Sequence, residues 1–154
     1  MMDMTMRLTI LKTATAGVLA YAATAVAPAA VFAADPQGVW MSADRDTKVR
    51  ISDCGGKLCG RVVWLKEPID PATGKPKTDK ENPDASKQRR PLIGLQIISG
   101  MQPKGSDTWQ GQIYNADDGK IYSASLELQS NTRAKVEGCV LSVLCKSQTW
   151  TRAN

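Results

Sequence analysis

The sequence predicts an all-β fold, a small eight-stranded up-and-down antiparallel barrel, with a β-sandwich as the alternative. Apolar and polar residues alternate with a period of two along most of residues 38–152, which is typical of strands with one buried face. Clusters of Gly, Asp, Asn and Ser separate these stretches, as turns require. A barrel is favoured over a sandwich because eight consecutive strands joined mostly by short turns can close and leave no free edge.

The alternation locates the first four strands. Val49 and Ile51 share one face of the second strand, and Val62 and Trp64 share one face of the third. Gly38 opens the first strand, ahead of Val-Trp. The expected strands in this half of the chain are residues 38–43, 47–53, 58–65 and 92–98.

The last four strands follow from the same pattern. Trp109 and Ile113 lie on one face of the fifth strand, and Ile121 alternates with Tyr122 in the sixth. The segment Asp117-Asp118-Gly119 between them is typical of a hairpin turn. The expected strands are residues 107–114, 120–129, 132–139 and 145–152.

The N-terminal segment has the features of a targeting sequence. Two basic residues precede an Ala-rich apolar run at 14–26, which is followed by Pro28 and ends in Val31-Phe32-Ala33. This pattern predicts a signal peptide over residues 1–33, cleaved near Ala33, which leaves residues 34–154 as one barrel domain. An uncleaved anchor is less consistent, because the run is shorter than the roughly 20 residues of a spanning helix. We therefore expect a periplasmic or secreted protein with no membrane span after cleavage.

The four cysteines form two close pairs in the sequence. Exported proteins oxidise their thiols, and three connectivities are possible for four cysteines. Local pairing is favoured because each pair flanks a plausible hairpin, which would place the two cysteines opposite each other. We expect the disulfides Cys54–Cys59 and Cys139–Cys145. A metal site is disfavoured because neither pair has Cys-x-x-Cys spacing and the chain has no His.

Residues 66–91 do not fit the strand pattern. The segment is rich in Pro and in charged residues, has no periodicity and contains a basic cluster at 87–90. Loops of this length without secondary structure are uncommon and are often functional. The segment is either a solvated connection between the third and fourth strands or a lid over one mouth of the barrel.

Composition excludes several kinds of chemistry. The absence of His removes Ser-His-Asp, Cys-His and His-ligated metal sites. The carboxylates that lie close together in the sequence are Asp44 with Asp46, Asp79 with Glu81 and Asp84, and Asp117 with Asp118. All lie in turns or in the polar segment, where solvation is expected to keep each pKa near its ordinary value. We predict no metal and no cofactor.

A nucleic-acid partner is not expected. The net charge of +5 is small for 154 residues, and basic residues are interleaved with acidic ones. The sequence contains no basic helix and no paired strand aromatics of the kind that bind single strands. The mild basicity instead favours solubility or a weak attraction to anionic surfaces.

Binding of a small molecule is the leading hypothesis. An eight-stranded barrel is just wide enough to be filled by side chains or to hold one small ligand. The candidate ligand contacts are the inward positions Ile51, Val62, Trp64, Trp109, Ile113 and Tyr122, with Asp84, Arg89 and Arg90 in the long loop. We expect an apolar or amphipathic ligand and no enzymatic activity. The alternatives are a filled barrel that serves an envelope interaction or stability, and an enzyme that uses Asp84 with Arg89 or Arg90.

Two resemblances support this interpretation. The Gly38-Val39-Trp40 start and the Trp150-Thr151-Arg152 end resemble the calycin pattern of lipocalins, in which the tryptophan packs under an arginine of the last strand. The resemblance implies that Trp40 and Arg152 close the base of the barrel through a cation over an indole face. The mature chain also resembles the bacterial secreted family catalogued as domain of unknown function 2147. That resemblance is carried by CGGKLCGRVVWL at 54–65, NPD at 82–84, RPLIGL at 90–95, WQGQIY at 109–114 and QTWTR at 148–152. It implies a small exported lipocalin-like barrel and brings no activity.

Overall fold

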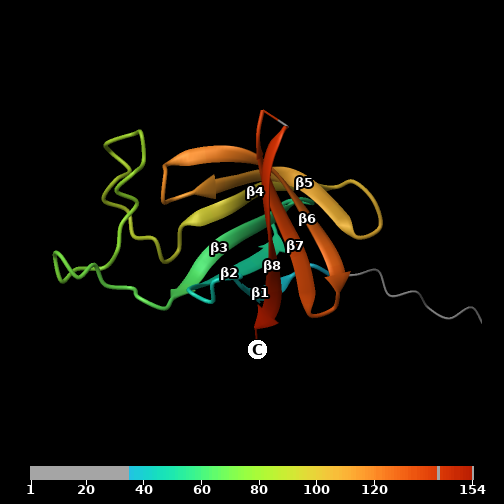
Figure 1. Cartoon of the computed structure of the whole chain (residues 1–154), viewed down its shortest axis with the longest axis horizontal. Coiled ribbons are helices and arrows are strands. Elements are labelled where there is room, and N and C mark those ends of the chain that lie inside the picture. The colour runs from blue at the N-terminus through green and yellow to red at the C-terminus, as the bar shows by residue number, and fades with distance from the viewer. Residues whose placement is uncertain (1–34, 142, 154) are drawn as a thin grey trace, which may run out of the picture. The chain divides into compact units, whose positions relative to one another are not determined.

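The computed structural model describes residues 35–141 and 143–153, which form eight antiparallel strands closed into one barrel (Figure 1). Each strand pairs with the next, and β1 also pairs with β8. The predicted up-and-down barrel is therefore confirmed, and the sandwich alternative is wrong. The strands are β1 (Gly38–Met41), β2 (Thr47–Asp53), β3 (Leu58–Leu65), β4 (Gln96–Pro103), β5 (Thr108–Asn115), β6 (Lys120–Ser130), β7 (Arg133–Val140) and β8 (Leu144–Ala153).

The signal peptide predicted at residues 1–33 lies outside the described residues. Within residues 35–141 and 143–153, no helix has the length and apolar character needed to cross a bilayer.

The fourth strand differs most from its expected position. It begins at Gln96, because residues 92–95 form a turn in which the Leu95 backbone N–H donates to the carbonyl of Leu92 at 3.0 Å. The strand then continues to Pro103 through Gly100, where φ is +63° and the register with β5 shifts. Such a bulge interrupts the period-two pattern, which is why the strand predicted at 92–98 ended too early, and it began too early because the turn at 92–95 contains apolar residues.

A packed core fills the end of the barrel where β1 begins and β8 ends. It is made by inward residues of all the strands, because alternate side chains of each strand point to the same face. Its fully buried side chains include Trp40, Val49, Ile51, Ile98, Met101 and Leu126. This half of the barrel is therefore packed with buried side chains.

The base of the barrel is closed by Arg152. Its guanidinium carbon lies 4.4 Å from the centroid of the Trp40 ring, and its nitrogens donate to the carbonyls of Asp35, Gln37 and Asn131 at 2.6–2.8 Å. Gly38 makes room for this contact, because a Cβ there would lie 2.5 Å from an Arg152 nitrogen. The cation–indole contact and three charged hydrogen bonds fix residues 35–37 and the end of β8 to the base.

Two disulfides staple neighbouring strands. Cys54 pairs with Cys59 across the β2–β3 turn, and Cys139 pairs with Cys145 across the β7–β8 hairpin. This is the predicted local connectivity. Disulfides are typical of proteins that fold in an oxidising compartment, outside the cytoplasm.

Candidate ligand-binding cavity

The half of the barrel opposite Arg152 is hollow. A cavity of about 1070 Å³ opens there and reaches the turns that join β1 to β2, β3 to β4, β5 to β6 and β7 to β8. In an up-and-down barrel these four connections share one end, so they form the mouth. The barrel is thus filled at its base and open at its mouth.

The base of the cavity is the top of the packed core. Val49, Val136 and Trp150 belong both to the core and to the cavity lining. The indole N–H of Trp150 donates to the side-chain oxygen of Gln148 at 2.9 Å, so the one polar atom of this ring is satisfied. A ligand would therefore meet an apolar floor with the Gln148 amide beside it.

The walls are apolar and the mouth is polar. Aliphatic side chains of four strands and of Leu95 cover the walls, and the charged side chains lie in the connections between strands or, for Lys146, near the start of β8. The wall residues include Val62, Leu65, Leu95, Ile97, Ile113 and Val140, and the mouth residues include Asp44, Asp46, Lys66, Glu67, Lys77, Asp117, Asp118 and Lys146. This gradient suits a molecule with an apolar body and a polar end.

Tyr122 and Asp118 form a hydrogen-bonded pair at the mouth, where the Tyr122 hydroxyl donates to an Asp118 carboxylate oxygen. Desolvation acts to raise the pKa of Asp118, but hydrogen bonds from Tyr122 and from the Lys120 backbone N–H outweigh it and lower the pKa. The same hydrogen bond to Asp118 raises the pKa of Tyr122. The pair therefore holds a carboxylate and a neutral phenol at the mouth near neutral pH.

A buried carboxylate anchors the long loop to the barrel. Asp79 is fully buried, and one of its oxygens accepts a hydrogen bond of 2.6 Å from the Tyr114 hydroxyl of β5. The other oxygen accepts from the Asn82 amide at 2.9 Å and from two Arg90 nitrogens at 2.8 Å. A buried charge is costly unless it is paired and hydrogen-bonded, and this one is both.

The anchor also fixes Tyr114 beside the cavity. The Asn82 amide donates to the Tyr114 hydroxyl at 2.9 Å, and the Arg90 guanidinium lies 5.7 Å from the ring centroid. Burial, and then the hydrogen bond to Asp79, raise the pKa of Tyr114. Tyr114 also lines the cavity, so this one side chain contacts both the long loop and the space available to a ligand.

The loop also packs against the β5–β6 turn. Gly119 has φ of +69° and is so close to the backbone carbonyl of Glu81 that a Cβ would collide with it. Turns and two isolated bridges, Ile69 with Pro76 and Thr78 with Pro91, give the segment its shape. Figure 1 shows it, in green to yellow-green, projecting beyond the ends of β3 and β4. The mouth is lined by three residues of this segment and by the residue directly after it, which are Lys66, Glu67, Lys77 and Leu92.

The expectation that the clustered acids are all solvated is wrong for Asp79. Turn propensity and polar neighbours predicted an exposed side chain, but a tyrosine from a distant strand buries it. Asp84 is exposed, yet hydrogen bonds from Ser86 and Lys87 lower its pKa to about 2. Local capping therefore shifts an acid even where water surrounds it.

The predicted apolar contacts separate into three groups. Val62, Ile113 and Tyr122 line the cavity, while Ile51 and Trp109 belong to the packed core. Trp64 faces outward: it is 39% exposed, and the Lys48 ammonium lies 5.3 Å from its ring centroid.

A bulge explains the position of Trp64. Val49 pairs with Val62, but Lys48 pairs with Trp64, so β3 has one extra residue at this point. One extra residue reverses the faces of a strand, and Leu65 rather than Trp64 lines the cavity. Simple alternation from Val62 could not reveal this.

The predicted polar contacts do not gather at the cavity. Asp84 pairs with Lys87 at 3.0 Å, Arg89 is exposed, and Arg90 pairs with Asp79. Arg90 borders a second hollow of about 340 Å³ rather than the main cavity. The ion pairs of Asp84 and Arg90 are thus made with Lys87 and Asp79 rather than with each other.

Sequence reasoning missed Trp150, Gln148 and Asp79. Trp150 was interpreted as part of a closing motif, although its place on the inward face of the last strand was a usable signal. The only indirect indication of Asp79 was that the motifs NPD at 82–84 and RPLIGL at 90–95 contain its partners Asn82 and Arg90. Nothing in the sequence pairs Asp79 with Tyr114.

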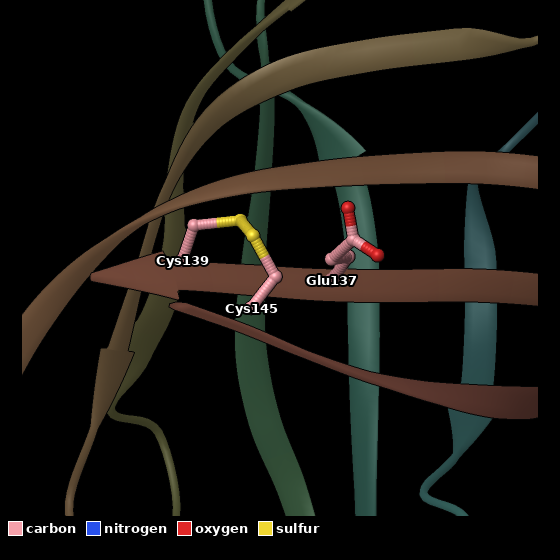
Figure 2. Close-up of side chains that lie close together, drawn as sticks. All are labelled: Glu137, Cys139 and Cys145. Carbon is pink, nitrogen blue, oxygen red and sulfur yellow. A yellow bond between two sulfur atoms is a disulfide. The ribbon is translucent and has the colours of Figure 1, made fainter. Parts of the chain in front are cut away.

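Figure 2 shows Glu137 close to the Cys139–Cys145 disulfide on neighbouring strands. Three potential metal ligands converge here, but both sulfurs are bonded to each other and Glu137 pairs with Lys135 at 3.1 Å. A thiolate is the form that binds metal, so the oxidised cluster is a structural staple.

Comparisons with known proteins agree with the fold. The structure is similar to protein HP1028 from the human pathogen Helicobacter pylori, which is described as belonging to the lipocalin family. The TM-score is 0.66 at 22% sequence identity, covering 78% of this chain and 84% of that one. The comparison with curated proteins gave no match. The family DUF2147, described as uncharacterized protein conserved in bacteria, matches residues 38–152, and the chain therefore belongs to this family.

Proposed function

We propose that this protein is an exported lipocalin-like module that binds a small, partly apolar molecule in the bacterial envelope. The observation that carries the proposal is the open cavity of about 1070 Å³ with apolar walls and a charged mouth. Ligand pockets typically measure about 300–1,000 Å³, so the space suits a molecule of lipid or drug size. The two disulfides support an extracytoplasmic location.

The shape of the core favours binding over a purely structural role. A barrel built only for stability gains most by filling its interior, because each unfilled volume loses packing contacts. Here the core ends at Val49, Val136 and Trp150, and the walls above them carry apolar side chains toward open space. An apolar lining left unfilled is typical of a pocket.

The lipocalin-like fold supports a binding protein rather than an enzyme. The acids at the mouth are turn residues, and Asp118 is held ionised by its hydrogen bonds from Tyr122 and Lys120. Acid–base catalysis needs a carboxyl whose pKa is raised toward the working pH. The one completely buried carboxylate among the described residues, Asp79, has its two oxygens already occupied.

Titration of the purified full chain with a dansyl-labelled fatty acid tests the proposal. We expect saturable probe emission, with energy transfer from Trp150 at the cavity floor. The variant Gly138→Leu should raise the Kd at least about tenfold, because Gly138 lines the cavity and its nearest neighbours, Ile113 and Tyr122, lie 3.4 Å and 3.7 Å from a Cβ placed there. A tenfold change corresponds to about 1.4 kcal/mol.

Gly105→Leu is the matched control, because no atom lies within 4 Å of a Cβ at that turn position. It should bind the probe as the parent chain does. Equal effects of the two variants would place the probe outside the barrel. Mass spectrometry of molecules retained from a bacterial envelope extract then identifies the natural ligand class, and a barrel that retains nothing and binds no probe would favour the ligand-free alternative.

A further inference from the structure

The β7–β8 hairpin ends in an exposed apolar tip, which we define as Val140, Leu141, Val143 and Leu144. Their exposed fractions are 43%, 86%, 76% and 71%. Figure 1 shows this hairpin projecting beyond the other strands at the top of the view. Ile121 on the neighbouring strand adds another exposed apolar side chain at 64%. Four large apolar residues in one projecting turn are unusual on a soluble surface.

The tip is not what hairpin formation requires. Leu141 has φ of +50°, a conformation that favours Gly, Asn or Asp over an apolar residue. The β1–β2 turn at 44–46 and the β5–β6 turn at 116–119, which lie at the same end of the barrel, use mainly polar residues and Gly for the same task. An apolar residue at a strained, solvent-exposed position points to a contact outside the chain.

The tip is held in a defined shape. The Cys139–Cys145 disulfide bridges its base, and Val140 pairs with Leu144 directly above. A covalent staple reduces the entropy lost when the turn becomes ordered in a contact. The exposed side chains are therefore held in place before any contact is made.

We propose that the apolar tip inserts into the surface of a lipid bilayer. A stable protein interface takes about 20–30 residues on each side, and a projecting tip of four residues offers far less. A narrow convex apolar element instead fits the boundary between headgroups and acyl chains, where binding scales with buried apolar area.

The location of the tip gives the contact a consequence. Val140, Val143 and Leu144 also line the cavity, so apolar surface continues from the tip into the mouth. A docked barrel would hold its mouth at the lipid surface, where a partly apolar molecule could enter without crossing bulk water. Bilayer docking goes beyond ligand binding and does not depend on it.

Binding of the full chain to vesicles of phosphatidylethanolamine and phosphatidylglycerol tests the inference. Leu141→Asn should weaken partitioning about tenfold, since it removes a largely exposed leucine at a position where Asn tolerates the backbone conformation. Leu141 does not line the cavity, so dansyl-probe binding without vesicles should be unchanged. Ile93→Asn is the matched control, because Ile93 is 47% exposed but lies far from the tip in sequence, in the β3–β4 connection.

Depth of insertion gives an independent measurement that overall binding cannot replace. A Leu141→Trp variant should show blue-shifted emission with vesicles and quenching by brominated lipids, whereas Ile93→Trp should show neither. Residues 1–33 are common to all variants and cancel in the comparison. Equal partitioning of Leu141→Asn and the parent chain, or an unquenched tryptophan at 141, would overturn the inference. A Leu141→Asn effect on self-association in sedimentation, without one on vesicles, would overturn it in favour of a second copy.

Discussion

Replacing Asp79 with Asn should destabilise the barrel by about 3 kcal/mol. Breaking a buried ion pair typically costs about 3–5 kcal/mol, and the lower end applies because Arg90 is 39% exposed and can regain water. The Asn side chain has the same shape as Asp, but its amide nitrogen replaces one carboxylate oxygen. This nitrogen is a donor, and it would face a donor group of a neighbouring residue. One of the four donor contacts, from Tyr114, Asn82 and the two Arg90 nitrogens, then loses its acceptor.

The partner variant Tyr114→Phe should cost about 2 kcal/mol, because it removes the hydrogen bond to the charged Asp79 and the one accepted from the Asn82 amide. The two losses should not add, since each variant removes the same 2.6 Å contact. We expect the double variant to cost about 1–2 kcal/mol less than the sum. Urea unfolding followed by tryptophan fluorescence measures all three values, with a constant m-value as the check on compactness.

Asp84→Asn is the matched control for this series. Asp84 lies in the same loop but is exposed and pairs with its neighbours in sequence, so its replacement should cost much less stability than that of Asp79. A cost below about 1 kcal/mol for Asp79→Asn, or equal costs for the two variants, would refute the assignment of Asp79 as the anchor of the loop. An activity that disappears in Asp84→Asn without loss of stability would instead revive the enzyme alternative.

Three further outcomes follow from the contacts at the base, at the mouth and within the long loop. Arg152→Ala should destabilise the barrel by about 2 kcal/mol in urea unfolding, because it removes the cation over the indole and three charged hydrogen bonds. Gly119→Ala should cost about 2 kcal/mol or more, through left-handed strain and collision with the loop backbone. Ser86→Ala should raise the pKa of Asp84 from about 2 toward 3.8 in a carbon-13 NMR titration, because Ser86 supplies the largest stabilisation of the carboxylate. Since folding depresses this pKa, its contribution to stability is present above about pH 4 and is lost as the pH falls through about 2.

Each of these outcomes has a contrary result. Arg133→Ala, which replaces an exposed arginine on the neighbouring strand, should be nearly neutral, and equal losses at Arg152 and Arg133 would contradict the closure of the base. Gly105→Ala is the control for Gly119→Ala, because a Cβ at position 105 has no atom within 4 Å. Equal costs of these two variants would contradict the collision at Gly119. An Asp84 pKa that stays at about 2 in Ser86→Ala would assign the shift to Lys87 and to the backbone N–H of residue 86 instead.

The sequence by itself determined the class of fold and its staples. Period-two alternation and the turn residues specified eight strands in order, and consecutive pairing with short turns leads to a closed barrel. The spacing of the cysteines around hairpins specified both disulfides. These features are local, because a turn or a hairpin is set by residues that are adjacent in the chain.

Only the tertiary structure decided which residues face the cavity. A single extra residue in β3 turns Trp64 outward and Leu65 inward, and the bulge at Gly100 moves β4 along the chain. A period-two pattern carries no information on register shifts, because the extra residue is recognised only against its partner strand. For the same reason, the sequence pattern could not indicate that Asp79 anchors the long loop.

Asp79 looks like any solvated turn acid until Tyr114 of β5 and Arg90 are brought against it. Its burial is a contact between residues 35 positions apart, and the barrel creates it by placing the β3–β4 connection beside the end of β5. The sequence thus determined that a barrel forms, and packing between distant strands decided that its base is filled, its mouth is hollow and its loop is fixed beside that mouth.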